Sequence, residues 1–396
     1  MPKSTKKSVK KLRKIYLDYA SSALFTSANP GAIHEFGLRE KKKLEDARAI
    51  IADILHARHD EIIFTSGATE SNNLAILGLV QNFSKPHIVT TNIEHTSILE
   101  VCKHLEKIKK AEVTYVEVEA NGIINPQKIK KALRPNTVLV SVMYANNEIG
   151  TVQPIAEIGK VIRHFRKRSD LQNSKRSDFG VRLPFFHTDA VQGINYLPIN
   201  ALKLGVDLMS LNAAKIYGPK GVGALYVKKN TPLRQIMFGG GQEKGLRPGT
   251  ENVASAMALA EALKITEKIK EKEVKRLTQL RDYFIKKLTN LNFGLVINGD
   301  LKERLPNNIN ITVPKIPSDL LVIELSARGI MISAKSACKS GDNKASHVIR
   351  AINPKAPEED GSLRFSLGRK TSKQDIDYTL ESLVEVLTKL KKWYNL

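Results

Sequence analysis

The amino-acid sequence predicts an α/β fold in which helices cover a large, mixed but mainly parallel sheet, with a smaller α+β domain beside it. The 396 residues include 42% hydrophobic residues, 24 glycines and 16 prolines, a globular composition that excludes a disordered or collagen-like chain. From Glu61 onward, short apolar runs alternate with segments of helical spacing, as is typical of parallel strands joined by helices. After about residue 250, a long charged helical stretch interrupts this alternation and indicates a second unit.

The apolar runs of the first region have the length and the bounding turn residues of buried strands. We expect strands at 61–67, 87–95, 113–119, 137–150, 185–191, 208–213 and 222–229. Segments of helical spacing separate several of them, at 69–83, 96–109, 126–133 and 155–168. The last two strands lie too close in sequence for a crossover helix, which predicts at least one antiparallel pair. Residues 169–182 are polar and aperiodic and predict a surface loop.

The second region predicts a long helix over 252–290, followed by a mixture of short strands and helices. The apolar runs are at 295–299, 308–313, 330–336 and 363–368, and the helices at 317–328, at 344–352 and from 373 onward. We therefore expect a basic tail (1–14), a large domain (24–255), and a small domain built from 15–23 and 256–396. No apolar run approaches the roughly 20 residues that cross a bilayer, so we expect no membrane segment.

The chain is strongly basic, with 63 Lys and Arg against 40 Asp and Glu and a net charge of +23. Positive charge is concentrated in residues 1–14 and in residues 163–182. Such clusters attract polyanions, and nucleic acid is one partner that they would suit. A solvated tail is the alternative that we favour, because the clusters contain few aromatic residues on which bases could stack.

The two cysteines, Cys102 and Cys338, cannot stabilise a chain of this size, and their scarcity favours a reducing compartment, the cytoplasm. Cys338 lies among small residues between Lys335 and Lys339. Neighbouring cations lower the pKa of a thiol, so we expect Cys338 to be a functional nucleophile. Cys102 lies on an amphipathic helical pattern and is expected to be a small buried hydrophobic residue.

Lys215 lies in a short linker between two apolar strands, in the sequence NAAKIYGPKGVGALYV. If it is buried, desolvation would favour the neutral amine and make it a nucleophile. The alternative is an ordinary solvated lysine, one of many in this chain. The motifs elsewhere in the sequence distinguish a nucleophilic Lys215 from a solvated one.

Polar or small residues follow several of the predicted strands, where ligands of open α/β sheets gather. The turn at Gly67 opens a helix, whose amide groups could bind phosphate together with the Thr69 hydroxyl. His95 could stack on an aromatic ring, although a lone histidine is more often structural. Asp189 requires a cationic partner if it is buried, for which a protonated pyridine nitrogen or an arginine would serve. Asn147 follows a fourth strand, and together these positions predict a ligand site at one edge of the sheet.

The motifs TSGATESNNLAI, NNEIGTVQPI, HTDAVQ, KIYGPKGVGALYV, GGGQEKGLRPGT, SAC and LRFSLGR occur in this order along the chain. Together they resemble the pyridoxal-phosphate-dependent cysteine desulfurases, the NifS/IscS-like group of the class V aminotransferase superfamily. The resemblance extends from about Ile15 to the last helix. It implies the fold type I of pyridoxal-phosphate-dependent transferases, a homodimer, and a reaction that converts L-cysteine to L-alanine.

The resemblance also implies a role for each candidate site residue. Lys215 would form the Schiff base with pyridoxal 5'-phosphate and exchange a proton at the substrate α-carbon. Cys338 would attack the substrate sulfur and carry it as a persulfide, and Arg364 would bind the substrate carboxylate. The remaining cofactor contacts would come from Ala68 and Thr69 (phosphate), Asp189 (pyridine nitrogen), Gln192 (ring hydroxyl), His95 (ring face, and catalysis), Asn147 (cofactor and substrate), Asn212, and Thr250 (phosphate in the other subunit). No metal ion is expected.

The chain departs from the family pattern just before Lys215. Asn212 stands where the family usually has serine, and Ala214 where it usually has histidine. The stretch between Ser22 and Asn29 is short for the family, whereas 169–182 has the character of an insertion. These departures keep two alternatives open, a selenocysteine lyase or other class V lyase, and a degenerate scaffold without catalysis. A desulfurase would supply a sulfur acceptor or a scaffold protein, for iron–sulfur cluster assembly or tRNA thiolation.

Overall fold

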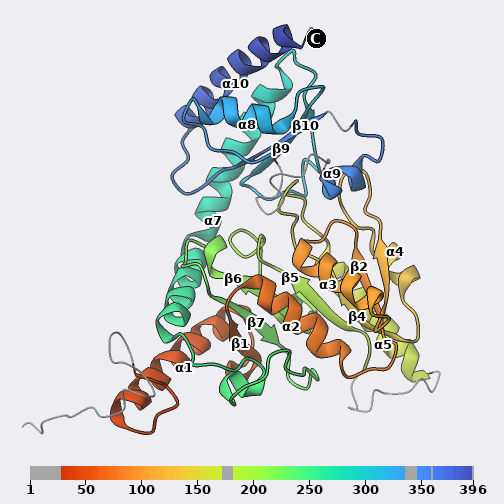
Figure 1. Ribbon diagram of the computed structural model, residues 1–396, viewed down its shortest axis with the longest axis vertical. Coiled ribbons are helices and arrows are strands. Elements are labelled where there is room, and N and C mark those ends of the chain that lie inside the picture. The colour runs from red at the N-terminus through yellow and green to blue at the C-terminus, as the bar shows by residue number, and fades with distance from the viewer. Residues whose placement is uncertain (1–27, 172–181, 335–345, 358–359, 395–396) are drawn as a thin grey trace, which may run out of the picture.

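The computed structural model describes residues 28–171, 182–334, 346–357 and 360–394. The chain forms two units, with the larger one at the bottom of Figure 1 and the smaller one at the top. A single long helix, α7, runs along the side of both. The predicted α/β class is confirmed.

The larger unit is built on a seven-stranded sheet of order β1-β7-β6-β5-β4-β2-β3. The pairs among β2 to β6 are parallel, whereas β7 is antiparallel to both β6 and β1. The expected antiparallel pair next to Lys215 is therefore confirmed. The strands are β1 (Ile62–Thr65), β2 (His87–Thr91), β3 (Glu112–Val116), β4 (Thr137–Ser141), β5 (Phe185–Asp189), β6 (Leu208–Asn212) and β7 (Gly223–Val227). Every residue of β2, β4 and β5 is buried, as in a sheet covered on both faces.

The helices of the larger unit begin at recognisable caps. His95 caps α3 (Thr96–Lys107), and Asn125 followed by Pro126 caps α4 (Pro126–Ala132). The other helices are α1 (Glu35–Leu55), α2 (Ala68–Val80), α5 (Ile155–Leu171) and α6 (Ala201–Leu204). Because α5 continues to Leu171, the start of the expected 169–182 loop is helical instead, and 172–181 lie outside the described residues.

The smaller unit contains an antiparallel sheet of order β10-β9-β8, with β8 (Val296–Ile297), β9 (Asn308–Val313) and β10 (Gly361–Ser366). Its helices are α8 (Ser318–Ser326) and α10 (Lys373–Trp393). The expected strand at 330–336 is wrong over its described part, 330–334. This segment meets the edge strand β10 at a single bridge, Ser333 with Arg364, and Met331 before it is 80% exposed, so no ladder forms.

Helix α7 (Val253–Thr289) connects the two units through two separate apolar clusters. Its first half packs against α1 and contributes Val253, Leu259 and Leu263 to the core of the large sheet. Its second half contributes Leu277 and Phe284 to the core of the small sheet. Helix α9 (His347–Ile352) follows the small-unit elements in sequence, yet its apolar face belongs to the larger core.

Candidate active site

A cavity of about 520 Å³ lies between the carboxyl ends of the large sheet's strands and the facing edge of the smaller unit. Nine of the predicted site residues line it, namely Ala68, Thr69, His95, Asn147, Asp189, Gln192, Asn212, Lys215 and Arg364. Thr250 is exposed and is not part of the lining. Cys338 lies outside the described residues. The structure therefore brings these nine residues together around one cavity, and their roles stay a prediction.

The start of α2 lines the cavity through Ala68 and Thr69. Gly67 turns the chain with a φ of 151°, and the first N–H groups of α2 then have no acceptors within the helix. A Cβ at Gly223 would lie 2.8 Å from the Gly67 Cα, so glycine in β7 allows the turn to pack closely. The side-chain nitrogen of Asn212 faces the same turn, 3.9 Å from where a Gly67 Cβ would be. The turn and the amide together offer a set of N–H donors that suits a phosphate group.

Asp189 ends β5 and is 6% exposed. Its Oδ2 accepts a hydrogen bond of 2.8 Å from Asn72 Nδ2, and its Oδ1 accepts one of 3.1 Å from the backbone N–H of Val191. Both donors are neutral, so they orient the carboxylate without neutralising its charge. Asp189 can therefore still pair with a cationic nitrogen in the cavity, which suits a protonated pyridine ring.

His95 is held by the helix that it caps. The backbone N–H of Ser97 donates to His95 Nδ1 at 3.2 Å, and Ser97 Oγ lies 2.8 Å from the same nitrogen. Because Nδ1 is an acceptor, the neutral ring carries its proton on Nε2. Asn72 Nδ2 also donates to Ser97 Oγ at 2.8 Å, so one amide links the supports of His95 and Asp189.

Sequence reasoning missed Asn72 and Ser97 as supporting residues. The available signal was their position, since Asn72 is fully buried in a helix whose other inward residues are mostly apolar. A buried amide on an apolar face requires partners, and here those partners are the candidate site residues.

Arg364 brings the smaller unit into the site from β10. Its Nη1 donates to the backbone carbonyl of Asn147 at 2.9 Å, and its Nη2 donates to Ser333 Oγ at 3.2 Å. The guanidinium is therefore already oriented at the cavity wall, where a carboxylate could bind it in a two-pronged manner.

Lys215 ends a short 3₁₀ turn (Ala213–Lys215) directly after β6. Lys215 is exposed, so of the two readings that the sequence left open, burial does not apply, yet the residue lines the cavity. Tyr217 follows with a φ of 64°, an unfavourable region for a residue other than glycine. The Arg369 guanidinium lies 4.0 Å from the centroid of the Tyr217 ring. The backbone N–H of Arg369 donates a hydrogen bond of 2.9 Å to the Tyr217 hydroxyl, so the segment that follows β10 is joined to the Lys215 turn.

Two further titratable groups of the larger unit, Glu94 and Cys102, are buried near the site residues. Glu94 precedes His95, and its Oε1 accepts from Thr91 Oγ1 at 2.6 Å and from the backbone N–H of Met143 at 3.0 Å. Burial raises the pKa of the Glu94 carboxyl to about 8. Burial likewise raises the pKa of the Cys102 thiol to about 12. The prediction that Cys102 is a buried apolar residue is confirmed.

Comparison with known proteins gives consistent matches over most of the chain. Residues 3–170 and 179–379 match the family Aminotransferase class-V. The chain is 41% identical over 395 residues to the cysteine desulfurase IscS of Dictyoglomus turgidum, covering 96% of each protein. Among solved structures, a NifS-like protein superposes with a TM-score of 0.80 at 33% identity, covering 91% of this chain and 92% of that one. SspA in complex with cysteine superposes with a TM-score of 0.69 at 34% identity, covering 88% and 92%.

Proposed function

The chain belongs to the class V aminotransferase family, and on that premise we propose that it is a cysteine desulfurase that uses pyridoxal 5'-phosphate. L-cysteine loses its sulfur to a thiolate of the protein, so that the substrate C–S bond breaks, an S–S bond forms and L-alanine is left. The observation that carries this proposal is the convergence of Lys215, Asp189 and Arg364, from two units of the fold, on one cavity.

The cavity residues fit the cofactor. The amides at the start of α2, the Thr69 hydroxyl and the Asn212 amide would hold the phosphate, and Asp189 would pair with the ring nitrogen. Gln192 would reach the ring hydroxyl and His95 would lie against the ring face. When bound, pyridoxal 5'-phosphate supplies an electron sink for negative charge at the substrate α-carbon.

The chain's own groups divide the remaining work. Arg364 and Asn147 orient the substrate by its carboxylate. Lys215 would hold the cofactor covalently and would move the proton at the substrate α-carbon. Cys338, between Lys335 and Lys339 in sequence, takes the sulfur as a thiolate, whose formation neighbouring cations favour.

We further propose that the active form is a homodimer in which Thr250 reaches the phosphate in the other subunit. Thr250 is exposed and does not line the cavity of its own subunit, which supports this role. Met237 and Phe238, just before the same loop, are 47% and 81% exposed, and a second subunit would cover them.

The receiver of the sulfur is proposed to be an acceptor or an iron–sulfur scaffold protein. The scarcity of cysteine favours the cytoplasm as the place of the reaction. Within the described parts of the chain, none of the helices has the length and apolar character that a bilayer crossing requires.

The test is the reaction of the purified protein with L-cysteine, added cofactor and a reductant. We expect alanine and sulfide in equal amounts. Cys338→Ser should bind the cofactor but release almost no sulfide, because serine cannot carry a persulfide, and Cys102→Ser should behave as the natural protein does.

Two outcomes would replace the proposal. Near-normal turnover in Cys338→Ser, with selenocysteine preferred to cysteine, would indicate a lyase. A protein that binds no cofactor and forms no alanine would be the degenerate scaffold that Asn212 and Ala214 keep open.

A further inference from the structure

The loop 239–250, with the sequence GGGQEKGLRPGT, places one buried carboxylate against the first helix of the larger unit. Glu243 is 6% exposed and pairs with Arg48 of α1 through two hydrogen bonds of 2.7 and 2.8 Å. Arg48 is itself 7% exposed. A two-pronged pair in this setting is strong and strict in its geometry, so it fixes where the loop can lie.

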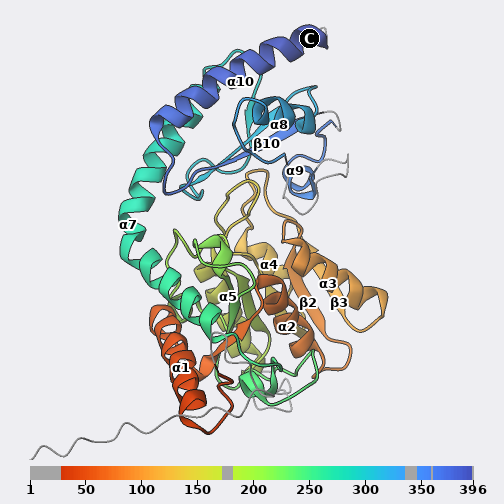
Figure 2. The ribbon, with the colours of Figure 1, turned by 60° about the vertical axis from the view of Figure 1, so that its left-hand side comes forward.

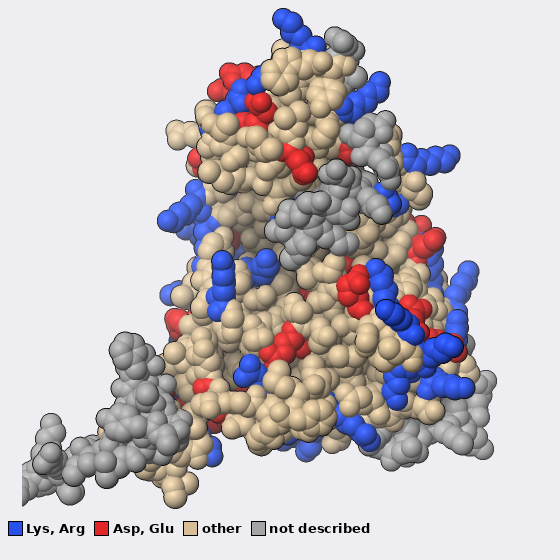
Figure 3. Space-filling view, viewed as in Figure 1, with Lys and Arg blue, Asp and Glu red and all other residues tan. Residues whose placement is uncertain are grey.

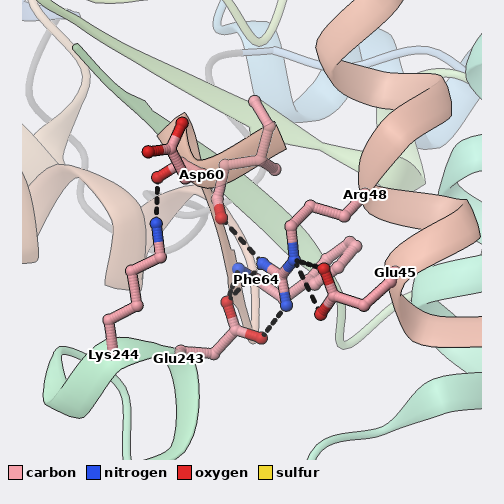
Figure 4. A network of polar contacts seen from close by, with 7 residues as sticks. Glu45, Arg48, Asp60, Phe64, Glu243 and Lys244 are labelled. Atoms are coloured by element: carbon pink, nitrogen blue, oxygen red, sulfur yellow. Dashed lines mark hydrogen bonds and ion pairs between the residues drawn. The ribbon is translucent and has the colours of Figure 1, made fainter. Parts of the chain in front are cut away.

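The same pair also holds strand β1, as Figure 4 shows. Glu243 Oε2 accepts a hydrogen bond of 2.9 Å from the backbone N–H of Phe64, and Arg48 Nη1 donates to the carbonyl of Ile62 at 2.7 Å. The guanidinium lies 4.9 Å from the centroid of the Phe64 ring. The loop is thereby attached to the strand that leads directly into the turn at Gly67.

A second contact attaches the loop just beyond that turn. Arg247 Nε pairs with Glu70 Oε1 at 3.0 Å, and Glu70 Oε2 accepts from the backbone N–H of Ser66 at 2.7 Å. Ser66 precedes Gly67, and Glu70 lies in the first turn of α2. The loop therefore holds both sides of the turn that would bind the phosphate.

The backbone conformation at Glu243 is energetically unfavourable in itself, and the contacts of the loop hold it in place. Glu243 and Lys244 have φ values of 45° and 60°, two successive non-glycine residues in the left-handed region. Such conformations persist only where the surroundings impose them. The Lys244 ammonium donates to the carbonyl of Asp60, which adds a second attachment at the entrance to β1.

We propose that the Arg48–Glu243 pair is a positioning element for phosphate binding. It sets the loop so that Arg247 fixes the turn at Gly67 and so that Thr250 is presented outward. This inference rests on the proposed function, since the phosphate is that of the cofactor. It assigns to Arg48 and Glu243 no contact with the cofactor itself.

The test compares two ligands of full-length apoprotein, pyridoxal 5'-phosphate and pyridoxal, each titrated by visible absorbance. Glu243→Gln should raise the Kd for pyridoxal 5'-phosphate about tenfold or more, the loss expected for one charge-assisted hydrogen bond, and leave the Kd for pyridoxal nearly unchanged. A merely structural role would weaken both ligands alike. The inference is overturned if the Kd values for both ligands rise by the same factor, or if neither Kd changes.

Arg247→Gln serves as a second variant, because its ion pair is partly exposed and its loss should not prevent folding. It should show the same selective loss, and it decides the outcome if Glu243→Gln does not fold. Arg134→Gln is the matched control, since its pair with Glu112 is exposed and lies at the opposite edge of the sheet. If the natural protein binds neither ligand, the proposed function fails and takes the inference with it, whereas normal binding with unselective variants refutes the inference alone.

Discussion

The two walls of the cavity are built differently. The wall of the larger unit consists of strand ends whose side chains are fixed by neighbours in the same core, as Asn72 fixes Asp189 and the support of His95. The wall of the smaller unit contributes Arg364, whose position depends on how the two units meet. The cofactor chemistry thus belongs to a rigid sheet, and substrate recognition to the contact between units. The predictions below run from the largest expected effect on sulfide release to the smallest.

Lys215→Ala, in the wall formed by the larger unit, should have the largest effect on the reaction. Loss of the proton-transferring amine should lower the rate of alanine formation about 10²–10⁴-fold. Borohydride reduction of the natural protein with bound cofactor, followed by peptide mapping, should find the covalent label on Lys215. A label on another lysine would contradict the assignment.

Arg364→Gln should affect the second wall and leave the first intact. Loss of a charged two-pronged contact costs about 1.5–3 kcal/mol, so the KM for cysteine should rise about ten- to hundredfold. The Kd for the cofactor should not change. Arg58→Gln, in an exposed pair with Asp60, is the control and should alter neither constant. A loss of cofactor in Arg364→Gln would mean that the two walls are not separable.

Ala214→His combined with Asn212→Ser restores the family residues in the first wall. An added imidazole donor should raise the affinity for the cofactor about ten- to hundredfold, with little change in kcat. The double variant should therefore lose cofactor more slowly on dialysis. If the natural protein already retains cofactor as firmly as the double variant, Ala214 is not a deficit, and the Asn212 amide beside Gly67 is sufficient.

Glu94→Gln should have the smallest effect on turnover. Its main effect should be on the pH dependence of the unfolding free energy. The folded carboxyl keeps its proton up to about pH 8, whereas the ordinary value is 4.5. Between these pH values the folded state binds more protons, so stability falls as pH rises through this window, by a few kcal/mol. The neutral variant should lose this decline in its unfolding free energy. A parallel decline in Glu94→Gln would assign it to another group.

The large sheet could be predicted from the sequence because its strands are short, apolar and bounded by turns, and because polar residues at several strand ends meet at one edge. The small sheet was less predictable. The apolar run at 330–336 has strand character, but in the described part of that run only Ser333 pairs with β10.

Helix α1 escaped sequence reasoning for a different reason. Its inward face includes Glu40 and Arg48, which break the apolar periodicity that marks a helix against a core. Their burial makes sense only once distant partners are in place, as Glu243 is for Arg48. Contacts of this kind leave no local pattern.

The Arg48–Glu243 pair also has a consequence for synthesis of the chain. The two residues are 195 positions apart, so at about 5–20 residues per second roughly 10–40 s pass between the making of one and the other. During that interval α1 can contact β1 but has neither Glu243 nor the packing face of α7, so Arg48 lacks its carboxylate partner and part of the apolar face of α1 stays uncovered. The nascent larger unit therefore cannot close from its own first half and stays exposed to chaperones and to misassociation until the loop and α7 leave the ribosome.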